Sequence, residues 1–235
     1  LRLSCLVLFK FNFVTNLSFF LFKELNYSTY FISIVARMGE VESSEEGNVM
    51  RRAQHIKKVL CDRVSTIVSQ NVTELDEVYP GIFIGDECSA RDRTSLRQHK
   101  ITHVVNAASG RGFGMVNTSA SYYADLNIKY LGIELSDLSV SDASRYFYST
   151  ADFIDEALQK QGRVLVHCLM GISRSSTLVL AFLMLKRNMS AVEAVTTVRK
   201  HRNIHPNDGF ITQLAALDMK LEKLRSNNPD RMENP

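Results

Sequence analysis

A continuous apolar run, Arg163-Val-Leu-Val-His-Cys168, is followed by a short glycine-containing loop and by a second apolar stretch over residues 174–187. An apolar run without polar alternation is typical of a strand that is buried on both faces, as in parallel sheets covered by helices. Further patterns alternate in the same way, with strands expected at 82–84, 103–107 and 130–135, and helices at 89–99, 147–158 (closed by Gly162), 190–202 and 208–226. We therefore expect an α/β fold with a central, mostly parallel sheet flanked by helices.

The first 37 residues differ in composition from the rest of the chain. They are rich in phenylalanine and leucine, but Lys10, Lys23 and Glu24 interrupt them, so no apolar span reaches the ~18 residues that a membrane helix needs. No basic region and small-residue cleavage site frame a signal peptide. Because the first methionine is Met38, we expect residues 1–37 to be upstream sequence that is not in the native protein.

Residues 38–74 are expected to be an N-terminal extension. Within them an amphipathic helix that packs on the next domain is predicted by apolar residues at three- and four-residue spacing, namely Ile56, Val59, Leu60, Val64, Ile67 and Val68. The basic residues before Val59 and Leu60 also resemble a kinase-docking peptide, although a solvated face beside a packed face is the simpler interpretation. The main domain is expected over residues 75–226, and residues 227–235 form a polar tail of the kind that stays disordered.

Charge and cysteine content exclude several classes of function. The net charge of +3 is too small to argue for a nucleic-acid partner, and we expect no membrane association of the main domain. Zinc-ligand spacing and a disulfide framework are both missing from the four scattered cysteines, Cys5, Cys61, Cys88 and Cys168. We expect a reducing compartment, the cytoplasm or the nucleus, and no metal or other cofactor.

The loop from Cys168 to Arg174 joins the buried strand to the apolar helix. Ligands usually bind at such a loop, and the N–H groups and positive dipole end of the helix suit an anion. Gly171 permits a turn that a side chain would resist, so that successive amides can point inward as a nest for phosphate oxygens. The candidate phosphate-binding residues are Leu169, Met170, Gly171, Ile172 and Ser173.

Two residues of the loop have the chemistry of nucleophilic phosphoryl transfer. Helix N-termini and nearby cations lower a cysteine pKa from ~8.5 into the ~3.5–7.5 range, which would make Cys168 a thiolate nucleophile. Arg174 carries a planar fork that matches two phosphate oxygens. Ser175 is placed to donate to the sulfur when the thiolate leaves, and His167 is expected to orient the loop through hydrogen bonds and not to transfer protons.

Transfer to sulfur also requires a general acid for the departing oxygen. Asp137, in the loop after the strand at 130–135, is the best candidate, because parallel strands bring their carboxyl ends to one edge of the sheet. A turn or helix-capping aspartate is the alternative interpretation, which fits Asp142 better.

Residues 75–224 resemble the small atypical dual-specificity phosphatases of the VHR-like type. The stretches that carry the resemblance are Asp76–Pro80, Ile101–Ala108, Gly132–Glu134, Ala151–Asp155, the Cys168 loop and Pro206–Phe210. The resemblance implies a protein tyrosine phosphatase-like fold and hydrolysis of phosphotyrosine and phosphoserine or phosphothreonine in proteins through a cysteinyl-phosphate intermediate. It implies that Cys168 is the nucleophile, Arg174 the phosphate clamp, Ser175 the donor to the leaving thiolate and Asp137 the acid.

The same resemblance implies further roles around the pocket. Phe113 matches a loop that lines the phosphotyrosine pocket, and Asn207 is a supporting residue. Arg202 falls where the family has a basic residue that grips a second acidic or phosphorylated group, although a charged helix end is an equal alternative. Mitogen-activated protein kinases are the partners expected for the family. Met170 and Ile172 depart from the family by making the loop apolar, which puts substrate specificity in doubt.

Two other functions stay open at this point. One is a phosphate-reading scaffold that has lost catalysis, although the cysteine, the arginine and the acid are all present. The other is a lipid, RNA or sugar phosphatase on the same fold, which the absence of lysine from the loop disfavours.

Overall fold

A computed structural model describes residues 44–62 and 75–227 of the chain. Backbone contacts divide the chain into two units, residues 1–48 and 49–235. The second unit holds every described strand and every described helix, except that the first helix, residues 45–61, begins in the first unit.

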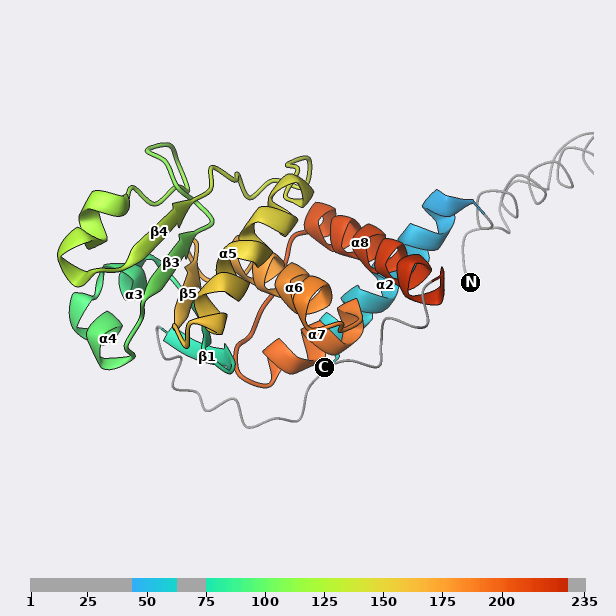
Figure 1. The fold of residues 1–235 in the computed structure, drawn as a ribbon. Coiled ribbons are helices and arrows are strands. Elements are labelled where there is room, and N and C mark those ends of the chain that lie inside the picture. The colour runs from blue at the N-terminus through green and yellow to red at the C-terminus, as the bar shows by residue number, and fades with distance from the viewer. Residues whose placement is uncertain (1–43, 63–74, 228–235) are drawn as a thin grey trace, which may run out of the picture. The chain divides into compact units, whose positions relative to one another are not determined.

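Five strands form one sheet in the order β1-β2-β5-β3-β4 (Figure 1). They are β1 Leu75–Tyr79, β2 Ile82–Gly85, β3 His103–Asn106, β4 Lys129–Gly132 and β5 Val164–His167. Strand β5 is parallel to its neighbours β2 and β3, β3 is parallel to β4, and β1 is antiparallel to β2. All four residues of β5 are buried. The predicted fold, with the apolar run as the central strand, is therefore confirmed.

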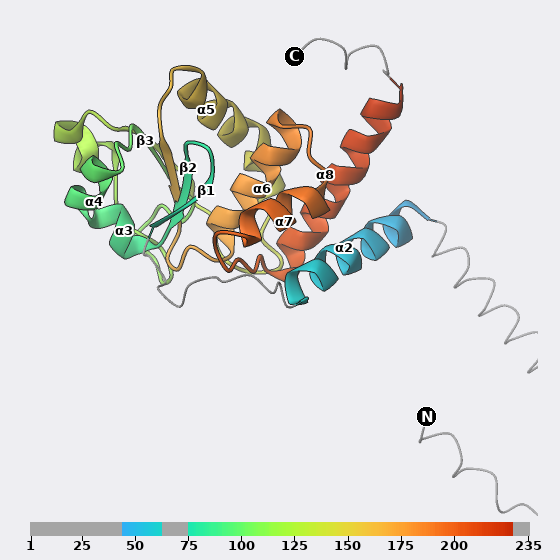
Figure 2. The same cartoon turned by 90° about the horizontal axis from the view of Figure 1, so that it is seen from below.

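Helices cover both faces of the sheet, as the two views in Figures 1 and 2 agree. The α-helices are α2 Glu45–Cys61, α3 Glu87–Arg91, α4 Arg93–Gln98, α5 Phe147–Gln159, α6 Arg174–Lys186, α7 Ala191–Arg199 and α8 Asp208–Asn227, and the 3-10 helices are η1 Ala120–Leu126 and η2 Ser144–Tyr146. Helices α3 and α4 lie on one side of the sheet, and α5 and α6 lie on the other, with α7 and α8 beyond them. Every residue of α6 from Arg174 to Met184 is buried, so α6 is the central helix of the thicker layer.

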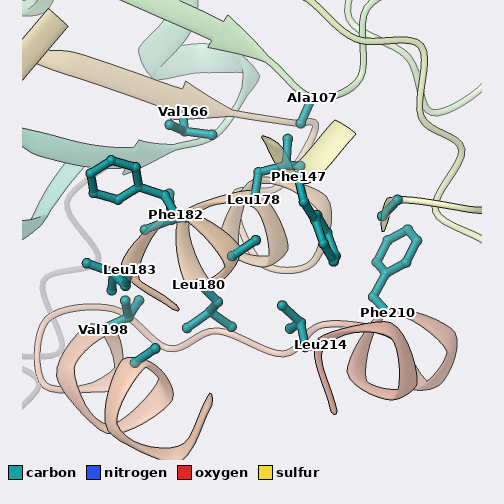
Figure 3. Packing of buried hydrophobic residues seen from close by; sticks show 14 of the residues in the cluster. Ala107, Phe147, Val166, Leu178, Leu180, Phe182, Leu183, Val198, Phe210 and Leu214 are labelled. Carbon is teal, nitrogen blue, oxygen red and sulfur yellow. The ribbon is translucent and has the colours of Figure 1, made fainter. Parts of the chain in front are cut away.

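Successive residues of the central strand enter different cores. Val164 and Val166 belong to the large cluster under α5 and α6, whereas Leu165 packs into a smaller cluster with Phe83 and Leu96. This alternation follows from the two-residue period of a strand. Figure 3 shows the large cluster, in which side chains of α6 meet the sheet on one side and α7 and α8 on the other. The two filled faces fix the register of the strand that leads into the Cys168 loop.

Of two predicted helix boundaries, one was wrong and one was confirmed. The helix expected at 89–99 is two helices, because Asp92 ends α3 and its side chain accepts hydrogen bonds from Thr94 N and Ser95 N at the start of α4, at 2.9 and 3.1 Å. Helix α5 is closed as predicted by Gly162, whose amide donates to Ala157 O at 2.8 Å, although the left-handed residue of the cap is Gln161, with a φ of +56°.

Strand predictions at the sheet edges were also incomplete. Strand β4 stops at Gly132 and does not reach residue 135. Strand β1 was not predicted, since Leu-Asp-Glu-Val-Tyr mixes polar and apolar residues and pairs on one side only, with β2.

Helix α2 packs on the main domain through one face, as predicted. Ile56 and Leu60 are buried in the large core cluster. On the polar side Arg52 Nη1 lies 2.8 Å from Asp218 Oδ2 of α8, and Lys57 Nζ lies 2.8 Å from Asp208 Oδ1. These pairs agree with the simpler interpretation of the basic residues, a solvated face beside a packed one. The helix begins earlier than the apolar spacing indicated, at Glu45; Val64, Ile67 and Val68 lie outside the described residues.

Within the described ranges no helix combines the length and the apolar character that crossing a bilayer requires.

The packing of α2 makes a prediction about stability. Ile56→Ala should lower the free energy of unfolding by roughly 2–5 kcal/mol, because it leaves a cavity in the main core. Met50→Ala on the same helix is the matched control, since Met50 is exposed and its replacement should change stability by less than about 0.5 kcal/mol. Urea unfolding followed by circular dichroism measures both. Equal midpoints for the two variants would contradict the packing of α2.

Candidate active site

Three loops meet at one edge of the sheet because β3, β4 and β5 are parallel and end there. The loop 168–173 follows β5, residues 107–119 follow β3, and residues 133–143 follow β4. This is the edge at which open α/β sheets bind ligands. The loop after β5 leads directly into α6, so its last residues lie at the helix N-terminus.

Cys168 is buried inside the loop and surrounded by donors. The Gly171 amide donates a hydrogen bond to Sγ at 3.2 Å, and the Ser175 hydroxyl lies 3.4 Å from Sγ. Burial by itself raises the pKa of the Cys168 thiol. The hydroxyl and amide of Ser175, the charge of Arg174 and the Gly171 amide outweigh that effect, so the thiol pKa is below its ordinary value. The arrangement favours a thiolate.

Gly171 is required by its conformation and by its surroundings. Its φ is +67°, which side-chain-bearing residues rarely adopt. A Cβ at this position would lie 2.5 Å from the Gly85 carbonyl oxygen and 2.5 Å from Nη2 of Arg202. The structure therefore agrees with the predicted tight turn.

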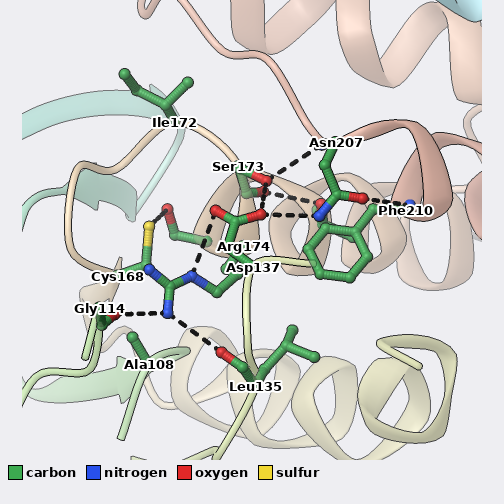
Figure 4. A network of polar contacts seen from close by, with 12 residues as sticks. Ala108, Gly114, Leu135, Asp137, Cys168, Ile172, Ser173, Arg174, Asn207 and Phe210 are labelled. Atoms are coloured by element: carbon green, nitrogen blue, oxygen red, sulfur yellow. Dashed lines mark hydrogen bonds and ion pairs between the residues drawn. The ribbon is translucent and has the colours of Figure 1, made fainter. Parts of the chain in front are cut away.

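The guanidinium of Arg174 lies beside the thiol sulfur (Figure 4). Its side chain is only 5% exposed, and Nη1 donates to the carbonyl oxygens of Gly114 at 2.9 Å and Leu135 at 3.2 Å. Nε lies 3.5 Å from Asp137 Oδ2 and makes no hydrogen bond within the described part of the chain. A buried donor without a hydrogen bond is costly, and a phosphate oxygen in the loop would satisfy it.

Asp137 is the aspartate that reaches the site. Its Oδ1 accepts hydrogen bonds from Ser173 Oγ at 2.7 Å and from Asn207 Nδ2 at 2.8 Å. Asp142 instead accepts from the hydroxyl and amide of Ser144 at 2.6 and 3.0 Å, and the hydroxyl bond lowers the pKa of its carboxyl. The two aspartates are thus placed as expected, with Asp137 at the loop and Asp142 at a helix start.

Arg202 does not face a position where it could grip a substrate, which corrects that prediction. The residue is buried, its Nε donates to Gly171 O at 2.8 Å and its Nη2 to Met170 O at 3.3 Å. Its Nη1 lies 2.7 Å from Asp76 Oδ2. The Arg202 guanidinium is thus bound to two carbonyl oxygens of the loop and to Asp76, so Arg202 supports the conformation of the loop.

His167 is neutral and holds the base of the loop. Burial lowers its pKa to about 4, and its Nδ1 lies 3.2 Å from the Cys168 carbonyl oxygen. Because a carbonyl oxygen only accepts, Nδ1 carries the proton. This matches the expectation of an orienting residue.

The apolar residues of the site differ in how far their side chains are exposed. The Phe113 side chain is fully exposed, so its loop touches the site through the Gly114 carbonyl and not through the ring. Met170 is exposed and Ile172 half-buried. Leu169 is half-buried, and its carbonyl oxygen accepts from the Glu87 amide at 3.1 Å.

Several supporting residues were missed by sequence reasoning. Asn106, at the end of β3, donates to Val116 O at 2.8 Å and accepts from Ala108 N at 2.9 Å, which closes the loop that carries Gly114. The Ser176 hydroxyl donates to the loop carbonyl of Ile172 at 2.6 Å. The role of Asn106 could have been predicted from its position as an asparagine at the end of a strand. Asp76, the partner of Arg202, has no local signal, since the two are far apart in sequence.

Metal ligands do not gather in the described residues: no three His, Cys, Asp or Glu side chains come together there. The cation that faces Cys168 is Arg174.

Comparisons with known proteins agree with this geometry. Residues 82–220 match the family described as "Dual specificity phosphatase, catalytic domain". Human dual specificity protein phosphatase 13B is 52% identical over 151 residues, which cover 64% of this chain and 75% of that protein.

Solved structures give the same result. The crystal structure of human DUSP28 matches with a TM-score of 0.56 and 25% identity over 64% of this chain and 96% of that one. The human tyrosine phosphatase-like serine/threonine/tyrosine-interacting protein matches with a TM-score of 0.51 and 31% identity, over 65% and 97% of the two chains. The chain therefore belongs to the dual specificity phosphatase family, as a protein phosphatase of the small atypical type.

Proposed function

We propose that Cys168, Arg174, Asp137 and Ser175 carry out the hydrolysis of phosphotyrosine and phosphoserine or phosphothreonine in proteins. The observation that carries the proposal is the position of the Cys168 sulfur, which receives donors from Gly171 and Ser175 and lies beside the Arg174 guanidinium. An anion-binding loop and a buried thiol with a lowered pKa are what attack on a phosphoryl group needs.

The first step forms a cysteinyl phosphate. Phosphate oxygens accept hydrogen bonds from the amides of residues 169–173 and from Arg174, which stabilise the charge of the transition state. The Cys168 thiolate attacks phosphorus while the ester P–O bond breaks. The Asp137 carboxylic acid gives its proton to the leaving oxygen.

The second step releases phosphate. The Asp137 carboxylate, now deprotonated, takes a proton from a water molecule that attacks the phosphorus of the intermediate. The S–P bond breaks and returns the electron pair to sulfur. The Ser175 hydroxyl, 3.4 Å from Sγ, donates to the departing thiolate.

Protein substrates suit the mouth of the site better than phosphoinositides. The loop residues Leu169, Met170 and Ile172 supply no charge for additional phosphates, and the neighbouring loops expose the apolar side chains of Phe113 and Leu138. The scaffold alternative is disfavoured because nucleophile, clamp and acid all converge on the loop.

We also propose phosphorylated mitogen-activated protein kinases as substrates, and the cytoplasm or nucleus as the place of action. The support is family resemblance and the presence of cysteines without a disulfide pattern. Arg202 is bound to Asp76 and to the loop, so we do not expect it to bind a second phosphate group of the substrate.

The acid role of Asp137 predicts a dependence on the leaving group. Asp137→Asn should lower kcat/KM for a phosphotyrosine peptide by roughly 10²–10⁴-fold, and that for nitrophenyl phosphate far less, since nitrophenolate leaves without a proton and kcat/KM does not include the second step that both substrates share. Asp152→Asn is the matched control and should behave like the unaltered enzyme, because the Asp152 side chain is exposed and pairs with Lys186 Nζ at 2.7 Å, outside the loops of the site. Steady-state kinetics on both substrates decide the matter. Equal losses on the two substrates would count against the acid role.

The contact between Ser175 and Cys168 predicts a change in pH dependence. Because the Ser175 hydroxyl helps to lower the pKa of the Cys168 thiol, Ser175→Ala should raise that pKa. The midpoint of Cys168 alkylation by iodoacetate, measured against pH, should therefore move upward. Ser149→Ala is the control, since this exposed hydroxyl donates to Tyr146 O at 3.3 Å at the start of α5 and its loss should leave the midpoint nearly unchanged. An unmoved midpoint in Ser175→Ala would refute the role of this hydroxyl.

A further inference from the structure

The loop that carries Asp137 has little structure of its own. Residues 133–143 lie outside helices and strands, and residues 136–140 are all exposed. Exposed irregular segments belong to the least stable parts of a protein. A proton donor nevertheless has to be held within about 0.5 Å of its productive position. The loop must therefore be fixed by contacts from another element.

Helix α8 and the residue before it supply those contacts at successive positions along the loop. Asn207 Nδ2 donates to Asp137 Oδ1 at 2.8 Å (Figure 4). Gly209 lies so close to the loop that a Cβ there would collide with the Ser139 carbonyl oxygen. The first contact lies within the active site, and the second is between the backbones of Gly209 and Ser139.

The third contact in this series is made by Gln213, one turn further along α8. Its Nε2 donates to Ser141 O at 2.8 Å, and its Oε1 accepts from Ala143 N at 2.8 Å and Ser144 N at 3.0 Å. One side-chain amide thus binds one carbonyl oxygen and two N–H groups of the loop backbone. Ala143 is completely buried, so its N–H would be left without a partner if the amide were lost.

We propose that Gln213 is a positioning residue that sets the place of the Asp137 carboxyl, although it lies outside the active site. The inference rests on the proposed acid role of Asp137. An amide suits the task because it carries a donor and an acceptor at its tip, which match the carbonyl of Ser141 and the amides of Ala143 and Ser144. Glutamate would keep the acceptor but place an oxygen against the Ser141 carbonyl, and methionine would supply neither group.

The test compares leaving groups in Gln213→Met and Gln213→Glu. Gln213→Met should lower kcat/KM for a phosphotyrosine peptide by about tenfold, a part of the roughly 10²–10⁴ that an acid supplies. Its kcat/KM for nitrophenyl phosphate should stay within about twofold, because this ratio does not include the second step that both substrates share. Gln213→Glu should fall between Gln213→Met and the unaltered enzyme. Gln159→Met is the control, because Gln159 binds Asp155 on α5.

A double variant separates positioning from a general structural effect. If Gln213 acts through Asp137, adding Gln213→Met to Asp137→Asn should cause no further loss on the peptide. Equal losses on both substrates, or a full additional loss in the double variant, would overturn the inference. If Gln213→Met does not fold, as judged by circular dichroism, the same comparisons on Gln213→Glu decide. A failure of Asp137→Asn itself to distinguish the two leaving groups would instead reject the acid role on which the proposal rests.

Discussion

A buried thiolate persists only where hydrogen-bond donors and a cation replace the water it has lost. Cys168 is almost completely buried, and burial alone would raise the pKa of its thiol and favour the protonated form. The amide of Gly171, the hydroxyl and amide of Ser175 and the charge of Arg174 reverse that balance. The rest of the fold provides these groups: β5 ends at His167, directly before the cysteine, the turn at Gly171 folds the amides inward, and α6 begins at Arg174.

The same edge of the sheet brings the other partners to the loop. The β3 loop supplies the Gly114 carbonyl, and the β4 loop supplies the Leu135 carbonyl and the Asp137 carboxylate, so the Arg174 guanidinium is held on three sides. Behind the loop, Arg202 binds two of its carbonyls and is neutralised by Asp76. Carbonyls that bind Arg202 leave the opposite side of the turn to amides. The site is therefore preorganised for an anion before substrate arrives.

Sequence reasoning succeeded where the cause is local. The apolar run of β5, the apolar helix α6 and the turn at Gly171 are dictated by neighbouring residues, and all three lie where they were predicted. It failed where a side chain's direction depends on distant partners. Arg202 was predicted to face the substrate, but it pairs with Asp76, which is close in space and 126 residues away in the sequence.

The central claim is that the phosphoryl group passes through the sulfur of Cys168, and trapping the intermediate tests it most directly. Asp137→Asn, which also lacks the base for the second step, would be mixed with nitrophenyl phosphate, quenched in acid within milliseconds and digested for mass spectrometry. We expect one added phosphoryl group on the peptide that contains Cys168, and none in the variant that also carries Cys168→Ser. A phosphoryl group on another residue, or full turnover with Cys168→Ser, would contradict the account.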